Sequence, residues 1–288
     1  MKQKIIDAHA HPDFGDNYSM QSAKEAGITF SLKGILKDFK KYNILKAVAL
    51  PKFTHYSRKE KINFTVRNDE IKKLILESKG RFIGGCTVKP TECTQEDIDV
   101  LDVDIKNGIF KAIKLYPGYE HFFPYEEKCT PIYELAQRNN IPVLFHTGDT
   151  WSEAGGAKLK YAHPLNIDEV AVSFPDVNFV LCHLGNPWII DAMEVLFKNN
   201  NVYADLSGFL VGKIDKTYKK YYDGRIRAIM EGIYFDYLRL VEKLMFGTDY
   251  PLANYDSYIK FIRMLDLTNK DFNKIFFENA VKVFNIKL

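Results

Sequence analysis

Eight short apolar runs, each followed by a longer segment of helical pattern, constrain the fold of this chain more than any other feature of its sequence. The predicted strands cover residues 5–11, 44–52, 81–89, 110–117, 141–148, 178–185, 201–208 and 243–251. These runs are almost continuously apolar, which is typical of parallel strands with both faces covered. Strands and helices that alternate in this number favour a closed (β/α)8 TIM barrel.

The main alternative is an open doubly wound sheet, which usually carries a glycine-rich phosphate loop after its first strand. Here the first predicted strand ends in His-Ala-His-Pro at residues 9–12. A single (β/α)8 barrel typically takes about 250 residues, and this chain has 288 with no low-complexity linker. We therefore expect one barrel domain over residues 1–288.

Several helices have clear start signals. Ser31, Asn68 and Thr130 each precede a helical pattern and are predicted as N-caps. Pro131 then falls at the first helical position, where its missing N–H costs nothing.

Two connections are long enough to carry function. Residues 12–30 and 208–242 each follow a predicted strand, so both are expected at the C-terminal face of the barrel, where substrate-binding loops lie. The second segment contains several tyrosines and phenylalanines. Aromatic residues are enriched at protein interfaces, so this segment predicts a homodimer.

Charge and composition narrow the class of partner. The formal net charge of +3 is too small to indicate nucleic acid or an anionic membrane. No apolar run approaches the roughly 18 residues of a membrane helix. The first residues carry no apolar leader segment, and the four cysteines lack CxxC spacing. We expect a cytoplasmic protein with reduced thiols and a small-molecule substrate.

Histidine and aspartate residues stand at the C-terminal ends of predicted strands. His9 and His11 are two residues apart, so both side chains point to the same side of their strand. His146, His183 and Asp249 each follow another apolar run. Imidazole and carboxylate are suitable ligands for a borderline divalent metal such as Zn²⁺. The pattern therefore predicts a catalytic metal site at the mouth of the barrel.

These motifs resemble the amidohydrolase superfamily, in particular its amidohydrolase-related branch, which includes aminocarboxymuconate-semialdehyde decarboxylase. The matching pieces are IIDAHAHPD, IKLYPGY, PVLFHTGDT, FVLCHLGNPW, NVYADLSG, FGTDYP and ENAVKVFNI. The resemblance implies a divalent metal, most often zinc, with His9, His11, His146 and Asp249 as its ligands. It also implies that His183 hydrogen-bonds the metal-bound water or the substrate, or binds a second metal.

Lys114 ends the fourth predicted strand and is expected to point into the barrel with Tyr116. In binuclear members of the superfamily a lysine here is carboxylated and bridges two metals. In the branch resembled, one metal without that bridge is commoner. The resemblance thus favours one metal, with the Lys114 amine near the substrate. Trp151 and His163 lie in later connections and are further candidates for substrate contact.

Two other residues beside the expected site have less direct roles. Asp205, after the seventh predicted strand, is expected to orient a ligand or cap the next loop. Cys182 neighbours His183 on the opposite strand face and is expected to pack against the helices.

The expected reaction is hydrolysis of a lactone, ester or amide by a metal-activated water. Asp249 would accept the water proton, while His183 and the metal would stabilise the oxyanion. Decarboxylation of an unsaturated or aromatic acid uses the same residues and is the alternative. A third hypothesis is a non-catalytic metal-binding module. Asp249 and His183 beside the ligands argue against it, because a structural site needs neither a base nor an open position.

Overall fold

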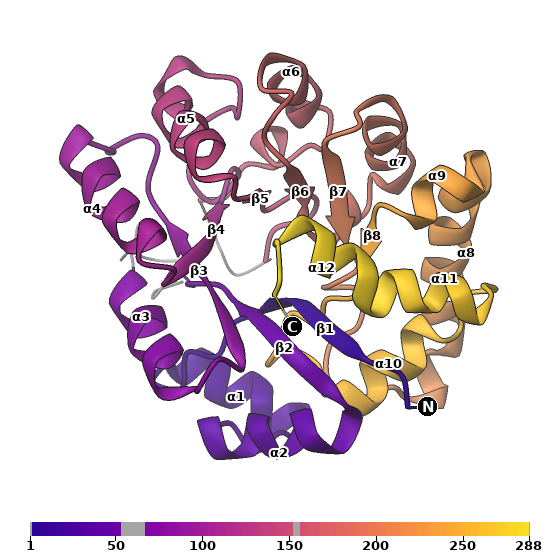
Figure 1. Cartoon of the computed structure of the whole chain (residues 1–288). Coiled ribbons are helices and arrows are strands. Elements are labelled where there is room, and N and C mark those ends of the chain that lie inside the picture. Colours follow the sequence, from indigo (N-terminus) through magenta and orange to yellow (C-terminus); the bar gives the residue numbers. More distant parts are fainter. Residues whose placement is uncertain (1, 53–66, 152–155, 288) are drawn as a thin grey trace.

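The computed structural model describes residues 2–52, 67–151 and 156–287, and within them eight parallel strands follow one another around a barrel in sequence order (Figure 1). The strands are β1 (Ile5–Ala10), β2 (Ile44–Ala49), β3 (Phe82–Thr87), β4 (Phe110–Leu115), β5 (Val143–Phe145), β6 (Phe179–Leu181), β7 (Val202–Asp205) and β8 (Leu244–Met245).

Backbone hydrogen bonds close the circle between β1 and the residues that follow β8. Ala8 N donates to Phe246 O (2.8 Å) and His11 N donates to Tyr250 O (2.7 Å). The predicted (β/α)8 barrel is therefore confirmed. Several strands end before the polar residues that close the predicted runs, so His11, His146, His183 and Asp249 lie on the connections just beyond the sheet. His9, Lys114 and Asp205 lie within β1, β4 and β7.

Helices surround the barrel (Figure 1). They are α1 (Asn17–Glu25), α2 (Leu32–Tyr42), α3 (Asn68–Glu77), α4 (Gln95–Lys106), α5 (Thr130–Asn139), α6 (Asn166–Ser173), α7 (Ile189–Lys198), α8 (Lys219–Phe235), α9 (Tyr237–Val241), α10 (Tyr255–Ile262), α11 (Asn269–Asn273) and α12 (Asn279–Val283). Ser31 caps α2 as predicted, since its side chain accepts a hydrogen bond from Gly34 N. Among the helices of the described residues, none combines the length and the apolarity that a bilayer crossing requires.

Two predicted helix starts are wrong by one residue. Asn68 is the first residue of α3 rather than its cap, because its side-chain amide pairs with the backbone of Thr87 at 2.8 and 2.9 Å. Thr130 is likewise already helical, because a 3₁₀ turn at Glu127–Cys129 leads directly into α5.

The barrel interior is filled by side chains from alternate strand positions. They belong to Ile6, Ala8, Val48, Leu50, Ile83, Ala112, Leu144, Val180, Cys182, Tyr203 and Met245. Residues of α12 pack on this cluster, and the helix lies across one end of the barrel (Figure 1). The segment before α12 meets the start of β1, where Lys4 Nζ lies 5.5 Å from the Phe277 ring centre. The amino-terminal end of the barrel is therefore covered, and the site lies at the opposite end.

Candidate metal centre and active site

Three ligand atoms from the two ends of the chain converge at the carboxyl end of the barrel. His9 Nε2 lies 3.1 Å from His11 Nε2 and 3.5 Å from Asp249 Oδ1, and His11 Nε2 lies 3.3 Å from the same carboxylate oxygen. All three residues are buried, and together they form a group that could hold a metal ion. All three are among the ligands that the sequence predicts.

The junction of β1 with the segment after β8 produces this convergence. Asp249 N donates to His9 O (2.9 Å), which fixes the aspartate beside the first histidine. Asp249 also adopts a left-handed backbone with φ 55°. The buried Asp7 carboxylate holds the adjoining turn, because Thr248 N donates to it at 3.0 Å and the Thr248 hydroxyl at 2.6 Å. Asp7 therefore supports the backbone of the site rather than a ligand ring.

The hydrogen bonds of Nδ1 in His9 and His11 determine which ring nitrogen of each can bind a metal. His9 Nδ1 lies 2.9 Å from Asp205 Oδ2, and His11 Nδ1 lies 3.0 Å from Leu50 O. A carbonyl or carboxylate oxygen can only accept, so each Nδ1 carries a proton. The Nε2 lone pairs then face each other and the Asp249 carboxylate, which requires a positive charge between them. This donor set fits a divalent metal such as zinc.

The titration of the three groups agrees with a site for a cation. Burial acts to lower the pKa of His9, but the adjacent Asp205 carboxylate outweighs it and raises the pKa to about 10. Burial lowers the pKa of His11 to about 4. Burial acts to raise the pKa of Asp249, yet its hydrogen bond with His11 and the charges of nearby histidines hold it well below its ordinary value. A proton on His9 therefore competes with a metal for the same place.

His146 lines the same cavity but is oriented differently. Its Nε2 lies 2.9 Å from Asp149 O, so this nitrogen carries the ring proton. The ring contacts that of Tyr119 at 4.7 Å between centres. If His146 joins His9, His11 and Asp249 as a ligand, it does so through Nδ1.

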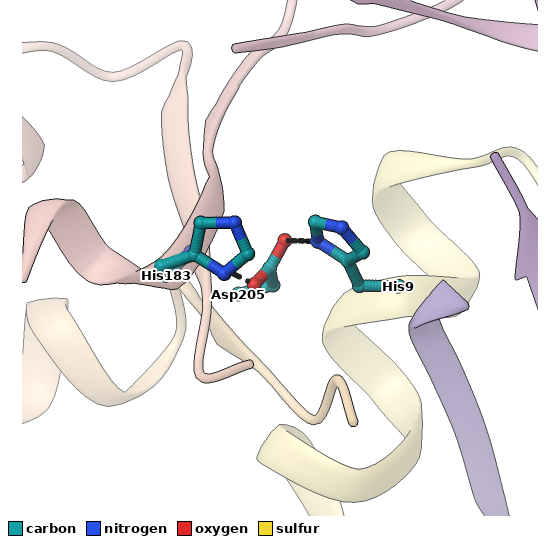
Figure 2. Close-up of side chains that lie close together, drawn as sticks. All are labelled: His9, His183 and Asp205. Carbon is teal, nitrogen blue, oxygen red and sulfur yellow. Dashed lines mark hydrogen bonds and ion pairs between the residues drawn. The ribbon is translucent and has the colours of Figure 1, made fainter. Parts of the chain in front are cut away.

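His183 lies beyond β6, with its ring centre 4.9 Å from that of His9 and 5.1 Å from that of His146. Burial lowers its pKa to about 4. Figure 2 shows the buried Asp205 carboxylate between His183 and His9; it accepts from the His183 backbone N at 3.0 Å. Asp205 also forms a hydrogen bond with Nδ1 of His9 and thus orients this candidate metal ligand, as the sequence suggested. Sequence reasoning missed Ser207, although its position two residues after Asp205 was a usable signal.

Lys114 is fully buried and points into the barrel, as predicted. Its Nζ donates to Cys182 Sγ at 2.7 Å and lies 5.1 Å from the centre of the Tyr116 ring, whose hydroxyl donates to Pro51 O. The prediction that Cys182 packs against the helices is wrong. Val180 and Cys182 share the inward face of β6 and its extension, because side chains two apart point the same way.

A cavity of about 130 Å³ opens over these residues. Its walls are formed by His9, His11, Tyr18, Lys52, Lys114, Tyr116, Tyr119, His146, Trp151, His183, Asp249, Pro251 and Leu252. Tyr18 was missed because it lies in the long segment after β1, which carries no motif. His163 does not belong to this lining, and its ring lies 4.7 Å from that of Trp188. Contact between His163 and the substrate stays a prediction.

Comparison with known proteins places the chain in a family. A family model described as amidohydrolase matches residues 6–286, so the chain belongs to the amidohydrolase family, as its motifs predicted. No curated protein sequence matches it.

Solved structures share the fold over nearly the whole chain. A probable 2-pyrone-4,6-dicarboxylic acid hydrolase from Acinetobacter baumannii has a TM-score of 0.67 at 15% identity, covering 99% of this chain and 100% of that one. The 2,6-dihydroxybenzoate decarboxylase from Rhizobium has a TM-score of 0.69 at 15% identity, with 98% and 99% covered. A dihydroxybenzoic acid decarboxylase from Polaromonas sp. JS666, with bound manganese, has a TM-score of 0.66 at 14% identity, with 98% and 97% covered.

Proposed function

We propose that this protein is a metal-dependent hydrolase of a small lactone, ester or amide. The observation that carries the proposal is the position of Asp249, whose carboxylate belongs to the metal-ligand group and also lines the cavity beside His183. An ionised carboxylate at that place can accept a proton from a water that attacks a carbonyl carbon. The similar structure from Acinetobacter baumannii, described as a hydrolase, supports this reaction class.

His9, His11 and Asp249 would hold the metal, with His146 as a fourth ligand through Nδ1. When bound, a divalent ion supplies a Lewis acid for the carbonyl oxygen and acidifies water. Zinc is the ion we propose from the nitrogen-rich donor set, and manganese in a similar structure is the main competitor.

The surroundings of Lys114 support one metal rather than two. Its amine is paired with the Cys182 thiol, which lies inside the barrel. A carboxylated Lys114 would have to give up this contact to reach a metal. Within the described residues, a second group that could hold an ion consists of His9, His183 and Asp205. In that group the Nδ1 proton of His9 already forms a hydrogen bond with Asp205.

Decarboxylation of an aromatic or unsaturated acid is the second candidate, and one feature of the cavity favours it. Two lysines, Lys52 and Lys114, line a cavity whose walls include four aromatic side chains. Tyr18 and Trp151 contact each other at 4.6 Å between ring centres, and Lys52 Nζ lies 4.4 Å from the Tyr18 ring centre. Flat rings and a nearby cation suit a planar carboxylate.

One experiment tests both reactions. The protein, freed of metal by a chelator and reloaded with Zn²⁺ or Mn²⁺, is assayed against lactones, esters and amides by acid release, and against hydroxybenzoates by release of carbon dioxide. We expect metal-dependent turnover of a lactone or ester, with kcat about 100- to 10,000-fold lower in Asp249→Asn. Turnover of hydroxybenzoates alone would overturn the proposed hydrolase function in favour of decarboxylation. Stoichiometric metal binding without turnover on either panel would favour the non-catalytic module.

A further inference from the structure

The turn after β6 holds His183 in an unusual conformation. Val180 and Cys182 point into the barrel, so a regular strand would direct His183 outward. Instead His183 and Leu184 both adopt left-handed backbone, with φ of 61° and 45°. This turn brings the His183 ring to the cavity. Non-glycine residues keep such conformations only where the surrounding contacts hold them.

The segment after β7 supplies those contacts. Asp205 Oδ1 accepts from His183 N at 3.0 Å, and Ser207 Oγ lies 2.8 Å from His183 Nδ1. Gly208 has φ +76°, and a Cβ atom there would lie only 2.7 Å from His183 Nδ1. The segment therefore fits closely against one edge of the ring, and Figure 2 shows this edge turned toward Asp205.

The hydrogen bonds around Asp205 determine where each proton lies. Backbone N–H groups of His183 and Ser207 donate to Oδ1 at 3.0 and 3.1 Å, and His9 Nδ1 donates to Oδ2 at 2.9 Å. The Ser207 hydroxyl donates its single hydrogen to the same carboxylate. Its oxygen can then only accept, so the 2.8 Å contact with His183 requires a proton on Nδ1.

We propose that Ser207 is a positioning residue whose hydroxyl, backed by the Asp205 carboxylate, holds the proton of the neutral His183 ring on Nδ1 and leaves Nε2 on the cavity side. The inference rests on the proposed function only in treating His183 as catalytic. It changes the expected order of events. In this tautomer Nε2 can only accept a hydrogen bond or a proton, and it can donate to an oxyanion or a leaving group only after it has taken up a proton.

The test reads the tautomer directly. Protein labelled with ¹⁵N in its histidine rings and loaded with Zn²⁺ is studied by NMR, where protonated and unprotonated ring nitrogens resonate apart; His183→Gln assigns the signals. We expect the Nδ1–H form in the wild type and population of the Nε2–H form in Ser207→Ala. On the best substrate, kcat should fall about 10- to 100-fold, with KM little changed.

Matched variants separate this role from general destabilisation. Ser207→Thr keeps the hydroxyl and should restore both the tautomer and kcat. Ser78→Ala removes a buried hydroxyl that donates to Ile75 O at 3.2 Å, far from the site at the end of α3, and should change neither. If Ser207→Ala does not fold, Gly208→Ala provides the test. Its methyl group would push the His183 ring away from Ser207, so the Nε2–H form of His183 should again become populated.

Each outcome decides the inference. An Nε2–H tautomer in the wild type, or an unchanged tautomer in folded Ser207→Ala, would overturn it whatever the rate. A changed tautomer with unchanged kcat would support the role of Ser207 and would instead overturn the catalytic role of His183. Failure of the inference and failure of the proposed function are therefore distinguishable.

Discussion

Metal affinity should rise steeply with pH, because His9 must lose a proton before Nε2 can bind an ion. Burial acts to lower the pKa of His9, and the Asp205 carboxylate raises it to about 10. The other two members of the ligand group do not compete in this way. Burial lowers the pKa of His11 to about 4, and the pKa of Asp249 lies well below its ordinary value. One proton therefore leaves for each metal bound at neutral pH.

The magnitude follows from the distance between the working pH and this pKa. A working pH of 7 lies about three units below the pKa of His9. Competition by the proton therefore costs about 4 kcal/mol, or roughly a factor of 1,000 in the apparent affinity for the metal. The direction of the pH dependence follows from the raised pKa of His9. The ring keeps its proton well below pH 10 and loses it as the pH rises toward 10, so metal affinity rises with pH. Between pH 6 and pH 9 the dissociation constant for Zn²⁺ should fall about tenfold per unit.

Competition against a chelating dye of known pH dependence measures this slope. Calorimetry in two buffers of different ionisation enthalpy gives the number of protons released, which should be close to one at pH 7. Asp205→Asn is the control, because it removes the charge that raises the pKa of His9. Its slope should flatten over the same range. Its affinity at pH 10, where little proton competition remains even in the wild type, should fall about 10- to 100-fold through loss of the hydrogen bond to the ligand ring. A flat slope in the wild type, or an equally steep slope in Asp205→Asn, would refute the reasoning.

Four further predictions follow from the site and the fold. His11→Ala should lose most bound metal by mass spectrometry while its circular dichroism stays native, because the His11 side chain serves the site and the packing of the barrel supplies most of the stability; unchanged metal content would count against it. Asp249→Asn should keep measurable metal yet lose about 100- to 10,000-fold in kcat, the range for removing acid–base help; full activity would exclude Asp249 as the base. Gly148→Ala should lower the midpoint of thermal unfolding, since φ is +94° and the new Cβ would lie 2.2 Å from Asn186 O. Left-handed backbone strain alone costs about 1–2 kcal/mol. Gly108→Ala is the control, because Gly108 has φ +76° with open space around it and its substitution should show only that strain. The aromatic content of residues 208–242 still predicts a homodimer, which light scattering at micromolar concentration checks; a monomeric mass would contradict it.

The local pattern of the sequence was enough for the barrel and for the main members of the site. An apolar run that ends in His9, His146 or Asp249 can be recognised from neighbouring residues of the chain alone. The period of a strand was enough to put His9 and His11 on one side. The same period places Lys114 and Tyr116 inside the barrel.

The same rule failed where the chain leaves the sheet. A regular strand over residues 178–185 with His183 facing the site would direct Cys182 outward against the helices. In the structure Cys182 follows the strand period and faces inward, where it meets Lys114. His183 reaches the cavity only because its backbone turns left-handed. No local pattern predicts that turn, because contacts from β7 hold it.

The protonation of the site was decided entirely by tertiary structure. Ser207 and His9 are separated by 198 positions in the chain, yet Ser207 Oγ lies 3.1 Å from His9 Nδ1. Closure of the barrel between β1 and the segment after β8 brings Asp249 to the two histidines. Hydrogen bonds act over about 3 Å, so which nitrogen holds a proton depends on neighbours that only the closed barrel supplies. The sequence by itself therefore determined the kinds of groups at the mouth of the barrel, and the fold determined which of their atoms are free to bind a metal or take a proton.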